Sequence, residues 1–228
     1  MITLSESFVK GDSGLNLRFF AKSFVSALFL CLVIFCLSVS LTVLFRPLYY
    51  WDMEHLSIPE RSGIPEAVCR ENYDVLIDYN LLGGPSVLEF PDFSMSESGR
   101  IHFEEVKHIF ICCQVIGAVG LVWLAGRVLR QLRRCDRDFT WLRWTGRAAL
   151  VLVALVGGLV AINWDRTFVL MHKILFRNDF WIFDAADDPV IRILPEPFFL
   201  HCGVLILILQ VLFAAICLLL ARHLKQKK

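Results

Sequence analysis

Two histidines have the residue type and the surroundings that acid–base chemistry on a lipid requires. His172 opens a stretch of apolar and aromatic side chains that continues through Phe176 to Trp181. His102 lies in a second aromatic stretch, next to Phe103. Imidazole has an unperturbed pKa of about 6.5, so it removes or delivers protons near neutral pH. Two such histidines at one level of the molecule could divide proton removal and proton delivery between them.

Four apolar segments must position these histidines. A helix needs about 20 apolar residues to cross a bilayer, and segments of this kind lie at 23–45, 109–129, 148–164 and 198–221. Hydrophobic residues make up 57% of the 228-residue chain, above the roughly 45–50% of soluble domains. The first segment is too long for a signal-peptide core, so we interpret it as an uncleaved anchor. The sequence predicts an all-α polytopic membrane protein with four transmembrane helices.

Charged residues predict how these helices are oriented. Three segments hold 14 of the 23 basic residues but only four of the 22 acidic ones. They are the N-terminus 1–22, the loop 130–147 with the adjoining Arg127, and the tail 222–228. The positive-inside rule places these three segments, and therefore both termini, in the cytoplasm. The acidic segments 46–108 and 165–197 are then expected outside a multi-pass protein of the cell membrane.

The outer segment 46–108 has room for a small extracytoplasmic cap. Residues 61–79 predict one or two short helices, with Pro65 suited to a first turn. Val87–Phe90 has the pattern of a short strand, and Ser94–Gly99 that of a polar turn or helix cap. Sixty residues bury little core by themselves, so we expect this mainly helical cap to rest on the membrane helices and the second outer segment.

Helical periodicity would align the aromatic residues around His172. If 165–178 forms an interfacial helix, Phe168, His172, Phe176 and Phe180 fall on one stripe at i, i+4 spacing. This stripe would face the boundary between cap and bilayer. His102 precedes its membrane segment by a few residues and would reach the same level.

Other chemistries lack their sequence motifs. The chain has no HExxH or comparable metal spacing, no glycine-rich phosphate loop and no G-x-S-x-G elbow, so we predict no metal and no cofactor. A net charge of +1 implies no nucleic-acid partner. Cys69 is alone in the outer segments, which argues against thiol–disulfide exchange. Two alternatives stay open: a non-enzymatic lipid- or lipoprotein-binding membrane protein, and a haem or quinone redox protein that uses His108 and His201.

Seven short segments also match a known family in order and spacing. They are Glu71–Asp74, Leu76–Tyr79, Ser94–Gly99, His102–Lys107, His172–Phe183, Asp187–Pro189 and Leu194–Phe199. In them the chain resembles the lipoprotein intramolecular transacylases, small four-span bacterial membrane proteins. The resemblance implies that the sn-2 acyl chain of a diacylglyceryl-modified N-terminal cysteine moves to the α-amino group of that cysteine, which leaves a lyso-form lipoprotein. It also implies that His102 and His172 are the catalytic residues.

Further residues are predicted to support this reaction. Asn72, Tyr73 and Asn178 are candidate donors to the developing oxyanion. The residues expected to enclose the acyl groups and exclude water are Phe103, Phe176, Phe180, Trp181 and Phe183. Glu105 either orients His102 or is a solvated acid. The expected partners are the lipoprotein substrate and membrane lipids, and the sequence leaves open the oligomeric state and which histidine is the base.

Overall fold

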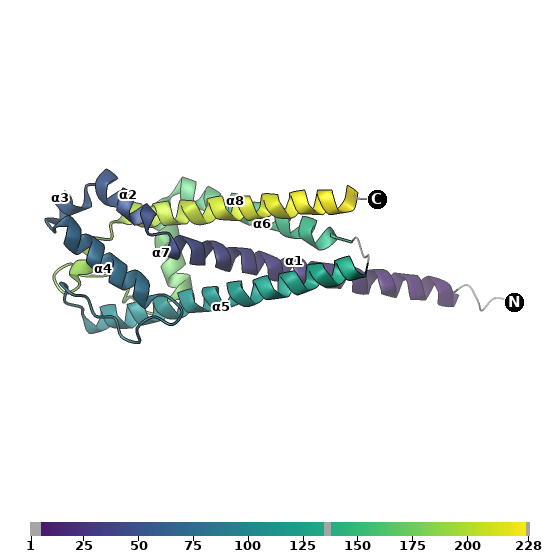
Figure 1. Ribbon diagram of the computed structural model, residues 1–228, viewed down its shortest axis with the longest axis horizontal. Coiled ribbons are helices and arrows are strands. Elements are labelled where there is room, and N and C mark those ends of the chain that lie inside the picture. Colours follow the sequence, from purple (N-terminus) through teal and green to yellow (C-terminus); the bar gives the residue numbers. More distant parts are fainter. Residues whose placement is uncertain (1–5, 135–137, 227–228) are drawn as a thin grey trace.

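The computed structural model describes residues 6–134 and 138–226, in which every regular element is a helix (Figure 1). The long helices are α1 (Glu6–Leu44), α5 (Glu97–Arg133), α6 (Thr140–Ile162) and α8 (Glu196–Gln226). The short ones are α2 (Pro47–His55), α3 (Ile58–Ser62), α4 (Glu66–Tyr79), α7 (Trp164–Leu175) and the 3-10 helix η1 (Pro189–Arg192). This architecture confirms the predicted all-α class.

The four long helices form an elongated bundle with α1 at its centre. Each contains an apolar stretch long enough to cross a membrane, as predicted. Half of the apolar window of α1 is buried, against 17–22% for the other three, because α1 packs against α5, α6 and α8. Gly120 of α5 lies so close to α1 that an added Cβ would fall 2.3 Å from a Val33 methyl carbon. Small residues of this kind let membrane helices approach closely.

Helix α5 is longer than a membrane crossing requires. It has 37 residues, whereas about 20 span the hydrocarbon core. The predicted apolar segment 109–129 lies within it, and the helix begins well before that segment, at Glu97. The first turns carry charged residues such as Arg100 and Glu104 and lie beside the cap (Figure 1). His102 therefore stands in the charged part of α5, outside its apolar stretch.

Helices α2, α3, α4 and η1 form the cap, together with the start of α8. Tyr49 stacks on Tyr73 with ring centroids 3.7 Å apart, and the Phe198 ring meets both edge-on. The Tyr49 hydroxyl donates to the carbonyl of Ile193. Helix α4, directly preceded by Pro65, confirms the helical prediction for 61–79. The cap core thus joins the two outer segments, as expected.

The short strand predicted at Val87–Phe90 is wrong, because the chain between α4 and α5 is irregular. A strand needs a neighbouring strand to share its backbone hydrogen bonds, and the described residues contain no strand. The side chain of Phe90 instead packs against the rings of Phe93 and Phe103. This loop therefore contributes aromatic packing rather than a sheet.

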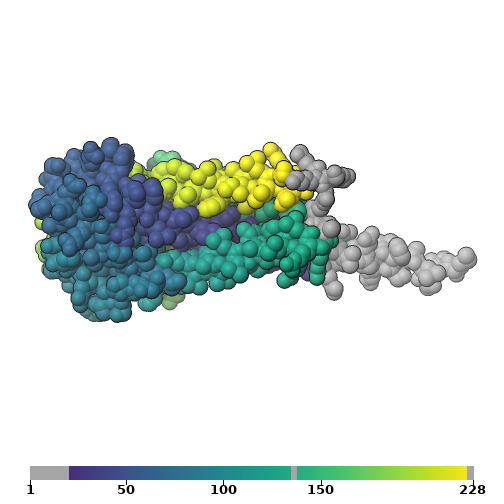
Figure 2. All heavy atoms as spheres, viewed as in Figure 1, coloured from purple at the N-terminus to yellow at the C-terminus, as the bar shows by residue number. Residues whose placement is uncertain are grey.

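Polar contacts hold the cap on the bundle. The side-chain amide of Gln114, on α5, accepts from the backbone N–H of Leu82 and donates to the carbonyl of Asn80. On the other side, the buried carboxylate of Asp52 in α2 lies 2.7 Å from Nδ1 of His201 in α8. In Figure 2 the cap atoms cover one end of the bundle directly. The junction between cap and bundle is a packed interface, and both histidines lie there.

Candidate active site

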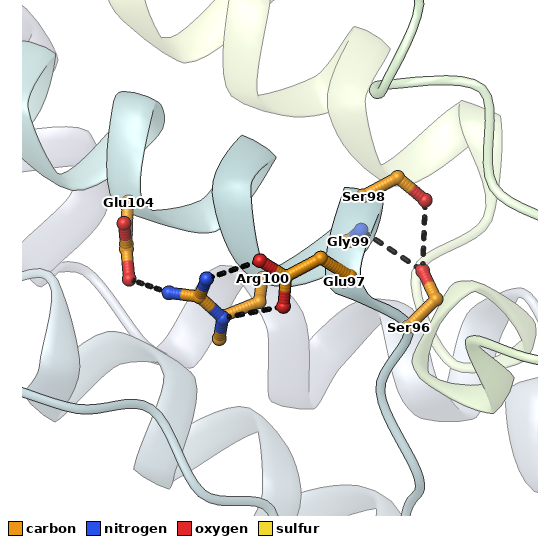
Figure 3. A network of polar contacts seen from close by, with 6 residues as sticks. All are labelled: Ser96, Glu97, Ser98, Gly99, Arg100 and Glu104. Atoms are coloured by element: carbon orange, nitrogen blue, oxygen red, sulfur yellow. Dashed lines mark hydrogen bonds and ion pairs between the residues drawn. The ribbon is translucent and has the colours of Figure 1, made fainter.

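Hydrogen bonds hold the first turn of α5, which directly precedes His102 in the chain. Ser96 caps the helix: its Oγ accepts from the backbone N–H of Gly99 at 2.9 Å (Figure 3), as serine commonly does at this position. The Asp188 carboxylate accepts from both the backbone N–H and the Oγ of Ser96, at 2.8 and 2.7 Å. These bonds confirm the predicted helix cap. They also fasten the start of α5 to the loop before η1.

On its exposed side the same turn is held by ion pairs. Arg100 donates to the carboxylates of Glu97 and Glu104 (Figure 3). Ion pairs between exposed side chains contribute little to stability. They lie on the exposed side of α5, whereas His102 is buried.

His102 is buried in a group of aromatic rings. Its side chain is 6% exposed. The centroid of its ring lies 4.7 Å from Phe176, 5.5 Å from Phe183 and 6.0 Å from Phe103. Nδ1 of His102 is buried without a hydrogen-bond partner. The imidazole is thus held by packing, and its nitrogens are not committed to the described residues.

Helix α7 brings the second histidine to the same place. It runs crosswise to the long helices, where the bundle meets the cap (Figure 1). Asn163 caps it by accepting from the backbone N–H of Arg166. Met171 and Ile174 are exposed, whereas His172 is only 8% exposed. This arrangement is typical of an interfacial helix with its apolar face toward lipid, and it turns His172 toward His102, with ring centroids 6.2 Å apart.

The hydrogen bond of His172 fixes its tautomer. Nδ1 lies 2.8 Å from the carbonyl oxygen of Phe168. A carbonyl oxygen only accepts, so Nδ1 carries the hydrogen and Nε2 of the neutral ring is left with a lone pair. The rings of Phe168 and Trp181 flank the imidazole at 4.2 and 4.6 Å. His172 thus presents a basic nitrogen inside an aromatic enclosure.

Burial keeps both histidines uncharged near neutral pH. It lowers the pKa of His102 to about 4, and the neighbouring His172 adds to this effect. Burial also lowers the pKa of His172, partly offset by the hydrogen bond to the Phe168 carbonyl. Desolvation disfavours the charged form of an imidazole, which explains the shared direction. The pair therefore begins any reaction in its neutral form.

The prediction that four aromatic and histidine residues form a stripe on one helix is wrong. Two of them, Phe168 and Phe176, nevertheless contact the histidine rings. Helix α7 ends at Leu175, and Phe176 is already extended. The side-chain oxygen of Asn178 accepts from the backbone N–H of Phe180, which forms a turn in place of a further helical turn. Phe176 reaches His102 from this extended segment, whereas Phe180 lies at the edge and is 38% exposed.

Asn178 and Glu105 bind each other. The amide nitrogen of Asn178 donates to both carboxylate oxygens of Glu105, at 3.0 and 3.2 Å. Glu105 lies nearly one turn after His102 on α5, so this contact ties the segment after α7 to the helix of the other histidine. Its carboxylate is thus used by Asn178, and the direct hydrogen bond to His102 that the sequence left open is not formed.

Asn72 and Tyr73 lie in the cap core instead of beside the histidines. Asn72 is fully buried, and its amide nitrogen donates to the Val68 carbonyl and the Asp92 carboxylate at 2.8 and 2.7 Å. Both amide hydrogens are therefore used. The ring of Tyr73 stacks on Tyr49. The structure does not bring these two predicted oxyanion donors to the site, because position 72 faces the inner side of α4.

Sequence analysis missed the role of Asp188, which it named only as part of a segment that matches the family. The carboxylate is almost fully buried and determines where α5 begins. A buried acid next to a proline could have been noticed, but its partner Ser96 is 92 residues away. Within the described ranges, no cluster of three or more His, Cys, Asp or Glu side chains could hold a metal ion.

Fold and site together define a class: a four-helix integral membrane protein with a buried, neutral histidine pair where its helical cap meets the bundle. A family model described as lipoprotein intramolecular transacylase Lit matches residues 24–199. The chain therefore belongs to the lipoprotein intramolecular transacylase family, which confirms the resemblance seen in the sequence.

Solved structures agree with this assignment. The membrane-integral lipoprotein intramolecular transacylase Lit from Bacillus cereus superposes with a TM-score of 0.85 at 31% identity, covering 90% of this chain and 94% of that one. A variant of the same protein with one histidine changed to arginine gives a TM-score of 0.80 at 30% identity, covering 95% of this chain and 97% of that one. An uncharacterized protein of Aquifex aeolicus is 29% identical over 118 residues, and this match spans about half of each chain.

Proposed function

We propose that this chain is a lipoprotein intramolecular transacylase acting on diacylglyceryl-modified lipoproteins. It moves the sn-2 acyl chain of the glyceryl group to the α-amino group of the N-terminal cysteine, giving an N-acylated lyso-form product. The observation that carries the proposal is the neutral histidine pair, with ring centroids 6.2 Å apart, inside an aromatic enclosure. Membership of the transacylase family supplies the reaction class.

His172 is the base in this proposal. An α-amino group has a reference pKa of about 7.7–8.0, so a neutral imidazole can take its proton as the nitrogen attacks the ester carbonyl. The hydrogen bond from Nδ1 of His172 to the Phe168 carbonyl supports this role, because it leaves Nε2 as the acceptor. Burial keeps that nitrogen unprotonated before the reaction.

His102 delivers the proton to the leaving oxygen. The C–N bond forms, the C–O bond at sn-2 breaks, and one proton passes from nitrogen to oxygen in total. As His102 gives its proton to the sn-2 oxygen, the proton removed by His172 replaces it. The pair is neutral before and after the reaction, which agrees with the direction of both pKa shifts.

The enclosure contributes mainly by orientation. Amine and ester belong to one substrate, and well-oriented intramolecular reactions gain about 7–11 kcal/mol in this way. Phe103, Phe176 and Trp181 are proposed to contact the substrate, with Asn178 and Phe180 at the edge. Their rings exclude water, which would otherwise hydrolyse the ester. No covalent acyl-enzyme is required.

The orientation in the membrane is also part of the proposal. The described start of α1, the end of α5, the start of α6 and the end of α8 lie at the end of the bundle opposite the cap (Figure 1). The last turn of α5 at that end is basic, so the positive-inside rule supports cytoplasmic termini and a site at the outer face. The proposed membrane segments are 23–45, 109–129, 148–164 and 198–221.

The pH dependence of stability is expected to report the neutral pair. An unfolded histidine takes up a proton below about pH 6.5, whereas folded His102 does so only near pH 4. The unfolded state binds more protons in this window, so stability falls as pH decreases through it, by an amount on the order of 2–3 kcal/mol for His102. Thermal unfolding in mild detergent between pH 7 and 4.5 should show a shallower decline for His102→Gln than for the wild type. Equal slopes would contradict the burial argument, and His108→Gln, an exposed histidine on the same helix, is the control.

An isotope experiment tests the proposed reaction. The purified chain is mixed with two synthetic diacylglyceryl lipopeptides of different peptide mass, only one of which has a deuterated sn-2 acyl chain. We expect mass spectrometry to find the label on the N-terminal nitrogen of the same peptide, with a lyso-glyceryl group. Label on the other peptide or in free fatty acid would refute an intramolecular transfer. Unchanged lipopeptides would favour the non-enzymatic lipoprotein-binding alternative.

A further inference from the structure

A second nitrogen in the histidine enclosure lacks a partner. Nε1 of Trp181, like Nδ1 of His102, is buried without a hydrogen-bond partner among the described residues. Native proteins rarely leave a buried N–H unpaired, and an exception needs a physical explanation. The indole nitrogen always carries its hydrogen and only donates. An uncommitted donor in a water-poor site is suited to an oxygen atom of the substrate.

Trp181 lies beside the imidazole to which we assigned the base. The two ring centroids are 4.6 Å apart, with an interplanar angle of 31°. The amine whose proton goes to His172 attacks the ester carbon, so that carbon must come close to His172. Its carbonyl oxygen would then lie near the Trp181 ring, which is packed against that imidazole. The oxygen that gains negative charge and the uncommitted donor thus belong to the same neighbourhood.

The other candidate donors are already in use or lie in the cap core, away from the histidines. Both amide hydrogens of Asn72 are donated within the cap, and Tyr73 packs in the cap core. The amide nitrogen of Asn178 is directed at the Glu105 carboxylate. Of the donors considered, Trp181 combines closeness to His172 with an N–H that has no acceptor.

We propose that Nε1–H of Trp181 donates the hydrogen bond that stabilises the oxyanion of the reaction. This role is additional to packing of the ring against the substrate, and it rests on the proposed function. The indole N–H donates to the carbonyl oxygen of the sn-2 ester. As the amine nitrogen bonds to the carbonyl carbon, the π electrons move to that oxygen and the hydrogen bond strengthens. When the C–O bond to the glyceryl oxygen breaks, the carbonyl re-forms as an amide. Trp181 keeps its hydrogen throughout.

Trp181→Phe tests this role, because phenylalanine keeps an aromatic ring and lacks the N–H. We expect kcat on the synthetic lipopeptide to fall by about 10²–10³-fold, the usual effect of removing one oxyanion donor, while KM changes less than about threefold. Trp51→Phe, an exposed tryptophan stacked on His55 in α2, is the matched control and should keep wild-type activity. A kcat for Trp181→Phe within threefold of the wild type would overturn the proposal.

Two unreactive analogues separate an oxyanion donor from a packing residue. A lipopeptide with a phosphonate at sn-2 has oxygens like those of the tetrahedral intermediate, whereas an sn-2 ether has no carbonyl oxygen. We expect Trp181→Phe to weaken phosphonate binding by the same factor as kcat/KM and to leave ether binding within threefold. Equal weakening of both would show that the ring only packs against the substrate.

Two further measurements keep the inference falsifiable. If Trp181→Phe does not fold, the indole N–H resonance of the wild type is compared with phosphonate and with ether bound, and only phosphonate should shift it downfield. The absence of that difference would overturn the proposal. An inactive wild type would instead contradict the proposed function, so the two failures are distinguishable.

Discussion

His172→Gln is expected to reduce the kcat of acyl transfer by about 10²–10⁴-fold, the range that general acid–base catalysis contributes. Glutamine can still donate to the Phe168 carbonyl, but it has no basic nitrogen to take the proton of the amine. His102→Gln should lose a similar factor, because the sn-2 oxygen then leaves without a proton. Single-turnover measurements on a labelled lipopeptide give these rates without interference from product release.

The double variant distinguishes a pair that acts together from two independent residues. If His102 and His172 pass one proton between them, removal of both should cost little more than the worse single change. Multiplicative losses would contradict a shared proton. His55→Gln, an exposed histidine of the cap, serves as the control and should remain near wild type. The Bacillus cereus relative with a substituted histidine keeps the family fold. We therefore expect the histidine variants of this chain to fold, so that a loss of activity reports on the chemical step.

Gly99→Ala is expected to destabilise the fold and to disturb the active site at the same time. An added Cβ would fall 2.4 Å from Oδ1 of Asp188, far below any real contact, and that carboxylate is held by two bonds from Ser96. The first turn of α5 must shift and lose the Ser96 cap and the hydrogen bonds to the buried Asp188 carboxylate. This should lower the free energy of unfolding by about 2–4 kcal/mol. His102 follows three residues later, so activity should fall as well. Thermal unfolding and the lipopeptide assay measure the two effects.

The same helix provides a matched control for Gly99→Ala. A Cβ at Gly126 would meet nothing within 4 Å, so Gly126→Ala should be neutral or slightly stabilising. Replacing Asp188 by alanine as well removes the atom that clashes. The double variant of Gly99 and Asp188 should therefore be less destabilised than the sum of the single changes. Strict additivity would show that the clash is not the cause.

The features that could be predicted from the sequence are those that depend on neighbouring residues in the chain. Four apolar segments are long enough for spans whatever their neighbours are, and Ser96 with Gly99 forms a cap within four residues. His102 and His172 could be singled out because each is a polar side chain in an aromatic stretch beside a predicted span. These features need no knowledge of distant contacts.

The remaining features depend on contacts between distant residues. Helix α7 stops before Phe176, in a segment where Asn178 binds Glu105, 73 residues away. Asn72 is directed into the cap by Asp92, on a loop that has no regular structure. The predicted strand at Val87–Phe90 failed because β-propensity is realised only with a pairing partner. Each of these outcomes was decided by tertiary packing.

Helix α5 is unbroken from Glu97 through its apolar stretch, and this continuity determines the depth of His102 relative to the lipid. His102 precedes Ile109 by seven residues, which is about 10 Å along a helix axis. The continuous helix α5 fixes the position of His102 relative to the apolar stretch, whereas the diacylglyceryl anchor of the substrate moves with the leaflet that holds its acyl chains. Hydrophobic mismatch tilts helices or deforms the bilayer at a cost of fractions of a kcal/mol per Å. We therefore expect the rate of acyl transfer to depend on hydrocarbon thickness and to be highest where the ester and the imidazoles lie at the same level.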